Sequence, residues 1–179
     1  MGTGQNVRGM TRRELLASGV KAGAVMVIGT SFVTHATDAW ALETKALKPE
    51  TMATLVQMAR DIYPHDRIAD KYYAIAVKSH DEKAAEDDAH RAMIEDGVAS
   101  LNARAAEQGT KSYLATGWEA ERVAILREME DGEFFQAVRG GLVVGLYNQK
   151  EIWPVFGYEG ESFSKGGYIE RGFDDIAWL

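Results

Sequence analysis

Apolar residues recur at intervals of three and four after residue 48, which is the spacing of an amphipathic helix. One such run covers residues 49–63, opens at Lys48-Pro49 and stops before Pro64, because proline disfavours helical geometry in the residue that precedes it. A second helix is expected next, with Asp66 as its cap. Its apolar residues are Tyr72, Tyr73, Ile75, Ala76 and Val77.

Three more helices are expected after residue 80. The segment 81–108 has a thin apolar stripe that ends before Gly109, which predicts a peripheral helix. Its stripe consists of Ala85, Ala89, Met93, Gly97 or Val98, and Leu101. The sequence Thr116-Gly117-Trp118-Glu119 matches a capping box and predicts a helix that buries Trp118, the stem of Arg122, Ile125, Leu126 and Met129.

The last expected helix follows Gly132 and carries two glycines on one side. Gly141 and Gly145 lie four residues apart, so the absent side chains would let another backbone approach closely. Its apolar residues are Phe134, Phe135, Val138, Leu142, Val143, Leu146 and Tyr147. No long run alternates with the period of a strand. The pattern therefore predicts an all-α domain of about five helices over residues 42–150.

The helical period ends after Lys150, and aromatic residues become frequent in the segment 151–179. These are Trp153, Phe156, Tyr158, Phe163, Tyr168, Phe173 and Trp178. A segment this aromatic is not typical of a solvated disordered tail. Either the chain's own helices cover the rings, or a partner protein does, since Trp and Tyr dominate protein interfaces. Both covers can apply, to different rings.

Residues 1–41 have the layout of an export signal. Arg12 and Arg13 precede an uncharged stretch over residues 22–33, and the small residues Ala39 and Ala41 form a cleavage site. The paired arginines and the weakly apolar stretch are typical of a twin-arginine leader. The stretch is shorter than the roughly twenty residues that span a bilayer. Two alternatives are a helix over residues 10–33 that packs on the domain, and an uncleaved leader that holds the protein at a membrane surface.

Charge and composition limit the kinds of partner and cofactor that this chain can bind. The net charge is −7, and it becomes −9 without residues 1–41, because that segment has four basic and two acidic residues. A surface this acidic argues against nucleic acid as a partner. The chain has no cysteine, which excludes disulfides, a thiolate nucleophile, cysteine-bound iron–sulfur clusters and c-type haem attachment in this chain. Another polypeptide would have to bind any such redox cofactor.

Two groups of residues are candidates for chemistry. Glu86, Asp87 and His90, with His80 earlier, have a spacing that resembles part of a carboxylate metal site, but no second such element follows, which favours a solvated charged face. His65 and Asp66 could be a base and its orienting carboxylate, but no nucleophile accompanies them. The favoured interpretation assigns no catalytic, cofactor-binding or metal residue. An independent periplasmic metal-binding protein or enzyme is the alternative.

Several segments together resemble a known family. They are the residues Ile62 to Asp66, Phe134-Phe135 with Arg139-Gly140-Gly141, Trp153 to Gly160, Gly166-Gly167-Tyr168 and Arg171 to Asp175. The chain resembles the small (gamma) subunit of membrane-bound FAD-dependent sugar and polyol dehydrogenases, of the gluconate 2-dehydrogenase subunit 3 type. The glucose and fructose dehydrogenase small subunits belong to the same group. The similarity extends over almost the whole chain.

The resemblance implies a non-catalytic subunit that carries the export signal for a catalytic flavoprotein and assists its maturation. It implies that FAD and any iron–sulfur cluster belong to a GMC-type dehydrogenase subunit, and haem c to a multihaem cytochrome subunit. It also implies use of the twin-arginine translocase and a periplasmic location at the inner membrane. The expected partner contacts are Tyr63, His65, Trp153, Phe156, Tyr158, Phe163, Tyr168, Phe173 and Trp178.

Overall fold

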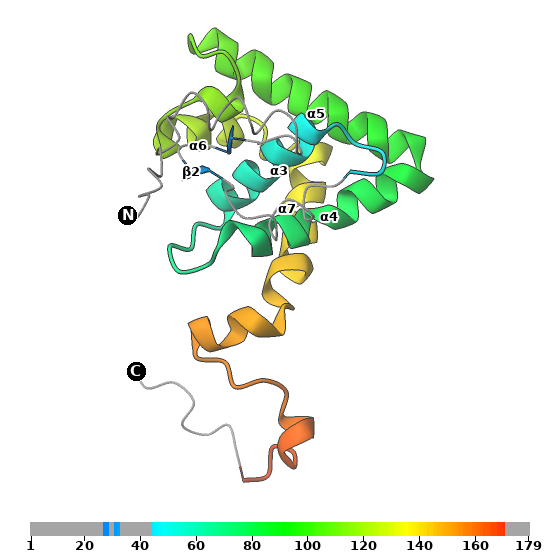
Figure 1. The fold of residues 1–179 in the computed structure, drawn as a ribbon, viewed down its shortest axis with the longest axis vertical. Helices are drawn as coiled ribbons and strands as arrows, with labels where there is room; N and C mark the ends of the chain where they lie inside the picture. The colour runs from blue at the N-terminus through cyan, green and yellow to red at the C-terminus, as the bar shows by residue number, and fades with distance from the viewer. Residues whose placement is uncertain (1–26, 29–30, 33–43, 171–179) are drawn as a thin grey trace, which may run out of the picture.

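The computed structural model describes residues 27–28, 31–32 and 44–170, and within these ranges the domain is helical, as the sequence predicts. Five α-helices account for most of the described residues (Figure 1). They are α3 (Pro49–Ile62), α4 (Asp70–Glu86), α5 (Asp88–Glu107), α6 (Glu119–Arg127) and α7 (Glu133–Tyr147). Short 3-10 helices are η2 (Tyr113–Ala115), η3 (Lys150–Phe156) and η4 (Ser162–Lys165). Two-residue strands β1 (Val27–Ile28) and β2 (Ser31–Phe32) pair antiparallel.

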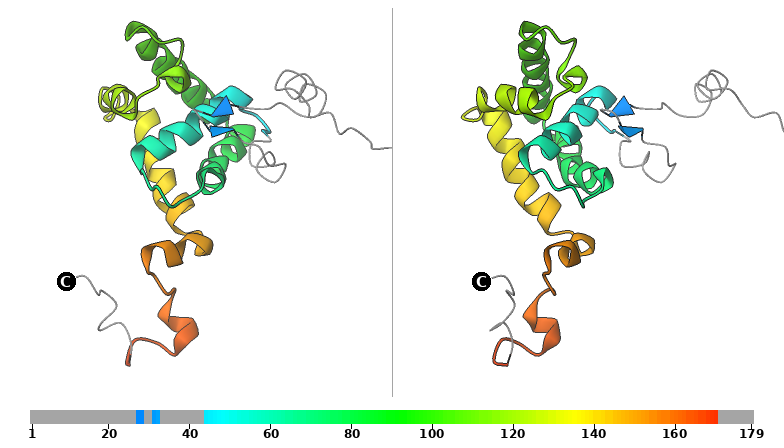
Figure 2. Two further views of the ribbon diagram at one scale, coloured as in Figure 1. Left: turned by 60° about the vertical axis from the view of Figure 1, so that its left-hand side comes forward. Right: turned by 90° about the vertical axis from the view of Figure 1, so that its left-hand side faces the viewer.

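Helix α3 is the central element of the domain. It contacts α4, α5, α6 and α7 (Figure 2), and most of its side chains are buried. Its buried apolar residues are Met52, Ala53, Leu55, Val56, Met58 and Ala59. A helix whose side chains are buried on most sides must be enclosed by others. The predicted boundaries of this helix agree with the structure to within one residue.

Helices α4 and α7 approach each other closely at two glycines of α7. A Cβ atom added at Gly145 would lie 2.8 Å from the carbonyl oxygen of Ala76 and 3.1 Å from its Cα. A Cβ added at Gly141 would lie 3.0 Å from Nε2 of His80. The predicted close approach at these glycines is therefore confirmed, and α4 is the helix that they admit.

The predicted helix over residues 81–108 is wrong at its start, because α4 continues to Glu86 and α5 begins at Asp88. Asp87 separates the two helices. Its backbone N–H donates a hydrogen bond to the carbonyl oxygen of Lys83 at the end of α4, and its carboxylate accepts hydrogen bonds from the N–H groups of Ala89 and His90 at the start of α5. The new start shifts the buried stripe, so Ala85 and Ala89 are exposed. The residues buried on α5 are His90, Ile94, Gly97, Val98, Leu101 and Ala105.

Asp81, expected to begin that helix, instead lies inside α4 and is fully buried. Its carboxylate accepts hydrogen bonds from the backbone N–H groups of Lys45, Ala46 and Leu47, at 2.7, 3.0 and 2.8 Å. Burial alone would raise the pKa of Asp81, but these three donors outweigh it and hold the pKa below its ordinary value. The segment that leads into α3 is thereby attached to α4.

Two predicted helix caps are also wrong. Helix α4 starts after Ala69 rather than Asp66, because residues 65–68 form a turn that buries Ile68. Helix α6 has Trp118 at its N-cap position, and this indole is 76% exposed instead of buried. A residue at the N-cap lies outside the helical turns and need not share their buried face.

The chain after α7 leads away from the helices. Residues 150–170, which we call the arm, comprise η3, η4 and the turns between them, and they extend from the C-terminal end of α7 (orange to red in Figures 1 and 2). Beyond η3, the described part of the arm therefore does not fold back over the domain.

We predict that Gly145→Ala destabilises the domain by about 1–3 kcal/mol, because the new methyl group would overlap the Ala76 backbone. Gly140→Ala is the matched control on the same helix: nothing lies within 4 Å of its added Cβ, so helix propensity should stabilise the domain by up to about 1 kcal/mol. Urea unfolding of both variants measures the difference. Equal stability in the two variants would contradict the close contact.

Candidate functional site

The arm joins the domain at a cluster of aromatic rings around Tyr147, the last residue of α7. The Tyr147 ring meets Tyr63 edge to face at 5.6 Å between centroids, and His65 at 5.7 Å. Phe156, at the end of η3, lies 5.0 Å from His65 and 5.7 Å from Tyr147. Edge-to-face pairs of this kind stabilise by about 0.5–1.5 kcal/mol each beyond the area they bury. We call these four residues the aromatic joint.

Polar bonds and one buried side chain reinforce the aromatic joint. The Trp153 indole donates to the carbonyl oxygen of Tyr147 at 2.8 Å, and Arg67 donates to the carbonyl oxygen of Val155 at 3.3 Å. The Ile152 side chain is 1% exposed and belongs to the domain core. Helix η3 is therefore part of the domain, although the sequence grouped it with the tail.

His65 is neutral at pH 7 in this cluster. Burial, and then the nearby Arg60 guanidinium, lower the pKa of His65 below its ordinary value. Its Nε2 atom lies 2.7 Å from the Tyr147 hydroxyl, whose own pKa is raised by burial and by Tyr63. The bond therefore joins two uncharged groups, and it fixes the loop before α4 to the end of α7.

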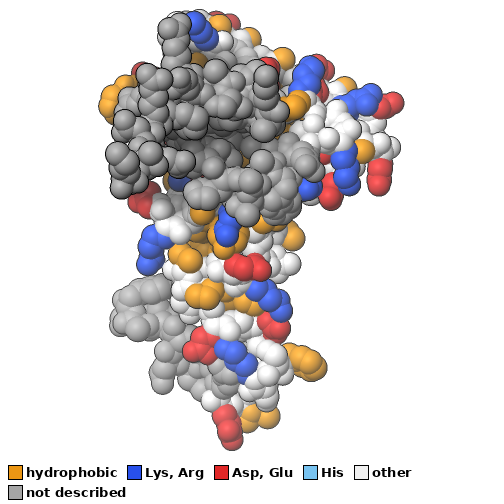
Figure 3. Space-filling view, viewed as in Figure 1, with side chains coloured by type: hydrophobic (Ala, Val, Ile, Leu, Met, Phe, Trp, Pro, Cys, Tyr) orange, Lys and Arg blue, Asp and Glu red, His pale blue; other side chains and the backbone are white. Residues whose placement is uncertain are grey.

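Beyond Gly157, whose φ of +73° ends η3 in the left-handed region, the arm presents its apolar side chains to solvent. Tyr158 is 52% exposed, although its ring lies 5.1 Å from Trp153. Phe163 is 93%, Tyr168 76% and Ile169 90% exposed. Figure 3 shows hydrophobic side chains interspersed with charged ones on this part of the surface. The chain's own described helices do not cover these side chains.

The predicted contact residues thus fall into two described groups. The first group is in the aromatic joint and consists of Tyr63, His65 and Phe156, with Trp153 beside it. The second group lies along residues 158–170, which we call the outer arm, and consists of Tyr158, Phe163 and Tyr168. The remaining predicted site residues lie outside the described residues. These are the export residues Arg12 and Arg13, the cleavage residues Ala39 and Ala41, and the tail residues Phe173 and Trp178.

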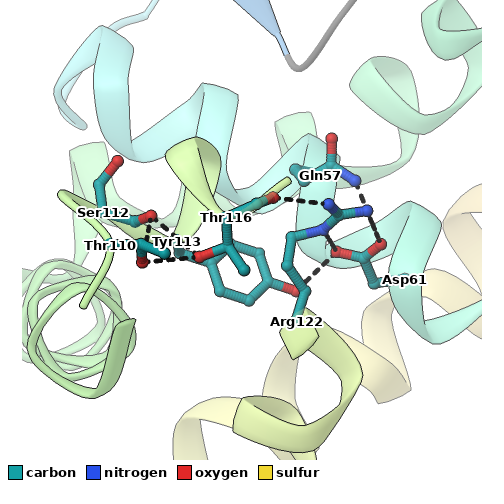
Figure 4. A network of polar contacts seen from close by, with 7 residues as sticks. All are labelled: Gln57, Asp61, Thr110, Ser112, Tyr113, Thr116 and Arg122. Carbon is teal, nitrogen blue, oxygen red and sulfur yellow. Dashed lines mark hydrogen bonds and ion pairs between the residues drawn. The ribbon is translucent and has the colours of Figure 1, made fainter. Parts of the chain in front are cut away.

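A buried ion pair that the sequence analysis missed lies next to the aromatic joint. Arg122 binds Asp61 through two hydrogen bonds, Nε to Oδ2 at 2.7 Å and Nη2 to Oδ1 at 2.9 Å. The Tyr113 hydroxyl donates to the same carboxylate at 2.7 Å, and Gln57 donates at 3.2 Å (Figure 4). Burial, with Asp61 next, raises the pKa of Tyr113 far above its ordinary value, so this hydroxyl remains a donor. The pair connects α3 to η2 and α6.

Figure 4 also shows why Thr116 does not cap α6. Its hydroxyl is within 3.0 Å of the Thr110 hydroxyl and donates to the carbonyl oxygen of Ser112 at 3.2 Å. Its carbonyl oxygen accepts a bond from Arg122 at 2.9 Å. The capping-box prediction is wrong because these partners hold Thr116 in the loop that closes over Asp61. Asp61 lies on the buried face of α3, three residues after Met58. An acidic residue among apolar ones was the signal in the sequence that could have indicated a buried ion pair.

A pocket of about 510 Å³ opens beside this ion pair, between the loop 64–66 and the loop 114–117. Arg60 and Arg122 both line it, but each already binds a carboxylate, Asp70 and Asp61 respectively. Asp61 and Asp70 also line the pocket, so its wall carries these two carboxylates beside the two guanidinium groups.

The predicted solvated face at Glu86, Asp87 and His90 is wrong for its histidines. His80 and His90 are 7% and 6% exposed, and Nδ1 of His80 lies 3.2 Å from Nε2 of His90. The two histidines are buried because the chain breaks at Asp87 and α5 packs against α4. Within the described part of the chain, no three His, Cys, Asp or Glu side chains come together as metal ligands.

No protein-family model matches the chain, and no curated protein or solved structure matches it. The resemblance to dehydrogenase small subunits therefore stays a prediction. Among the described residues, no helix is both long enough and apolar enough to cross a membrane.

We predict that Arg122→Gln lowers the free energy of unfolding by about 3 kcal/mol, because it leaves the buried Asp61 carboxylate without its counter-charge. The loss should fall at the lower end for a broken buried pair, since Tyr113 still donates to Asp61. Arg127→Gln, an exposed change on the same helix, is the control and should alter stability by less than about 0.5 kcal/mol. Denaturant titration at pH 7 distinguishes the two.

Proposed function

We propose that this chain is a non-catalytic small subunit of a periplasmic FAD-dependent sugar or polyol dehydrogenase complex. It supplies the twin-arginine signal for a catalytic flavoprotein and holds that partner through the arm. The exposure of the outer arm is the observation that carries this proposal. Phe163, Tyr168 and Ile169 lie close together in the sequence and are each more than three-quarters exposed.

Exposed apolar side chains in such a segment favour a covering partner. Large aromatic and aliphatic groups cost free energy in water, and contiguous exposed patches commonly mark interaction sites. Aromatic anchors of this size also provide most of the binding energy in protein interfaces. The outer arm is therefore the part of the described chain best suited to enter apolar pockets of another protein.

The aromatic joint supports the same function because it fixes the start of the arm before any partner binds. Tyr147, His65 and Phe156 hold η3 against the domain, and Trp153 bonds to the end of α7. A segment whose base is already ordered loses less conformational entropy on binding. The partner then has to order only the residues beyond Gly157.

The nature of the partner follows from the family resemblance and from composition. The chain has no cysteine, so iron–sulfur clusters and c-type haem require other subunits. The resemblance assigns FAD and an iron–sulfur cluster to the flavoprotein, and haem to a multihaem cytochrome c. This chain would provide the export signal, assist maturation and supply a docking surface in that complex. It would provide no reacting group.

The alternative, an independent metal-binding protein or enzyme that uses His65, Asp66 or His90, has less support. The His65 ring bonds to Tyr147 and the His90 ring bonds to His80. Each histidine therefore has one ring nitrogen already engaged, which leaves at most the other to bind a metal or accept a substrate proton.

The docking role is tested by co-expression with the flavoprotein of a neighbouring reading frame. We expect a yellow flavoprotein to co-purify with the unchanged chain and to be lost with the double variant Phe163→Ser, Ile169→Ser. Both side chains are about 90% exposed, so the variant should fold normally. Trp118→Ser, which removes an exposed indole on α6, is the control and should retain the flavoprotein. Retention by all three chains would refute docking through the arm.

The export role is tested separately with the double variant Arg12→Lys, Arg13→Lys. We expect the flavoprotein to stay active but to accumulate in the cytoplasm, because the translocase reads the arginine pair as an address. Dehydrogenase activity in periplasmic and cytoplasmic fractions measures this. Unchanged periplasmic activity in the variant would contradict the proposal, whatever the outcome of the docking test.

A further inference from the structure

A pair of buried histidines lies where α4, α5 and α7 meet, outside the surface used in the proposed function. His80 on α4 and His90 on α5 have ring planes within 7° of parallel, with centroids 5.4 Å apart. Their facing nitrogens are 3.2 Å apart, which is the distance of an N–H···N hydrogen bond. The rings therefore lie edge towards edge, with Nδ1 of His80 directed at Nε2 of His90.

This geometry limits how many protons the pair can bind. A hydrogen bond between two ring nitrogens needs one that carries a proton and one that does not. Two neutral rings satisfy this condition, and so does a pair with one extra proton on an outer nitrogen or between the rings. When both rings are cations, two N–H groups and two positive charges face each other, and the bond is lost.

The surroundings prevent the rings from separating within the closed structure. On the α7 side, a Cβ added at Gly141 would lie only 3.0 Å from Nε2 of His80, so there is little space for that ring to retreat. On α5, the backbone N–H of His90 is bound to the Asp87 carboxylate at 3.1 Å, which holds the first turn in place. We therefore expect separation of the rings to move α5 relative to α4.

The nearby charges act against protonation of the pair. Lys83, one turn after His80, adds a positive charge that acts on both rings, and Asp87 opposes it at His90 alone. From α7 the residue that faces His80 is Gly141, which has no charge. No described carboxylate is therefore placed to stabilise the doubly charged pair as a whole.

We propose that the His80–His90 pair is an acid-sensitive lock on the corner between α4 and α5, closed when at most one ring is charged and opened when both are. Opening would loosen the first turn of α5 and the contact of α4 with α7. The lock would make the state of the domain depend on the acidity of its compartment. This inference does not depend on the proposed function.

The pKa values support the direction of the effect. Burial, then His90 and Lys83, lower the pKa of His80 from 6.5 to about 4. Burial and Lys83 lower the pKa of His90 as well. The unfolded chain binds protons on these residues near pH 6.5, whereas the folded chain resists them to a lower pH. The stability that the pair contributes is complete above pH 6.5 and is lost as the pH falls towards 4.

The test compares urea unfolding of the full chain with that of the variant His80→Gln, His90→Gln, at pH 7.5 and at pH 4.5. Glutamine can still form hydrogen bonds but does not titrate. We expect the folding equilibrium constant of the unchanged chain to fall at least tenfold more over this range than that of the variant. His65→Gln, which removes a histidine outside the corner whose pKa is also lowered, should reduce the acid loss by less than the double variant does.

A local measurement keeps the proposal testable if the double variant does not fold. We expect the protection factors of the amide hydrogens at residues 88–92 of the unchanged chain to fall between pH 6.5 and 4.5 more than those in the centre of α3. Nitrogen NMR of the imidazole rings should show that both titrate below pH 6.5. The proposal is wrong if the acid loss is equal in the unchanged chain and the double variant, or if either ring titrates at 6.5 while residues 88–92 stay protected.

Discussion

The backbone contact between α4 and α7 determines the arrangement of the domain. Only glycine at position 145 allows the Ala76 carbonyl group to lie against α7, and only glycine at position 141 leaves room for the His80 ring. Because α7 is seated this closely, its last residue, Tyr147, reaches the loop after α3 and bonds to His65. The direction in which the arm leaves the domain therefore depends on two absent side chains some distance from it.

The helical pattern was readable from sequence because burial on one helix face imposes a regular spacing, as in α3 and α7. The close contact at Gly141 and Gly145 could be predicted because residues four apart lie on the same side of a helix. The errors concentrate at helix ends. Asp66, Asp87 and Thr116 all have good capping chemistry, but the residue that caps a helix depends on which partners the fold brings near. Asp87 has its cap partners in its own helix, whereas Thr116 is held by Thr110, Ser112 and Arg122.

The candidate site was only partly readable for a related reason. The sequence identified the aromatic tail, but it did not show that η3 packs on the domain while the residues after Gly157 are exposed. That division depends on Tyr147 and on where α7 ends. Asp61 and Arg122 are 61 positions apart, so the sequence marks Asp61 as an acidic residue among apolar ones but does not show which residue it pairs with. The paired histidines were misread as surface residues because their burial comes from the break at Asp87, which the spacing of apolar residues did not reveal.

The hydrogen bonds that Asp81 accepts from the N–H groups of Lys45, Ala46 and Leu47 bear on the predicted removal of residues 1–41. These are main-chain donors, so they do not depend on which side chains occupy the three positions. A peptidase that cut after Ala41 would leave this grip untouched, since the first held residue lies four positions downstream. Removal of the predicted leader after Ala41 would therefore keep the attachment of this segment to α4.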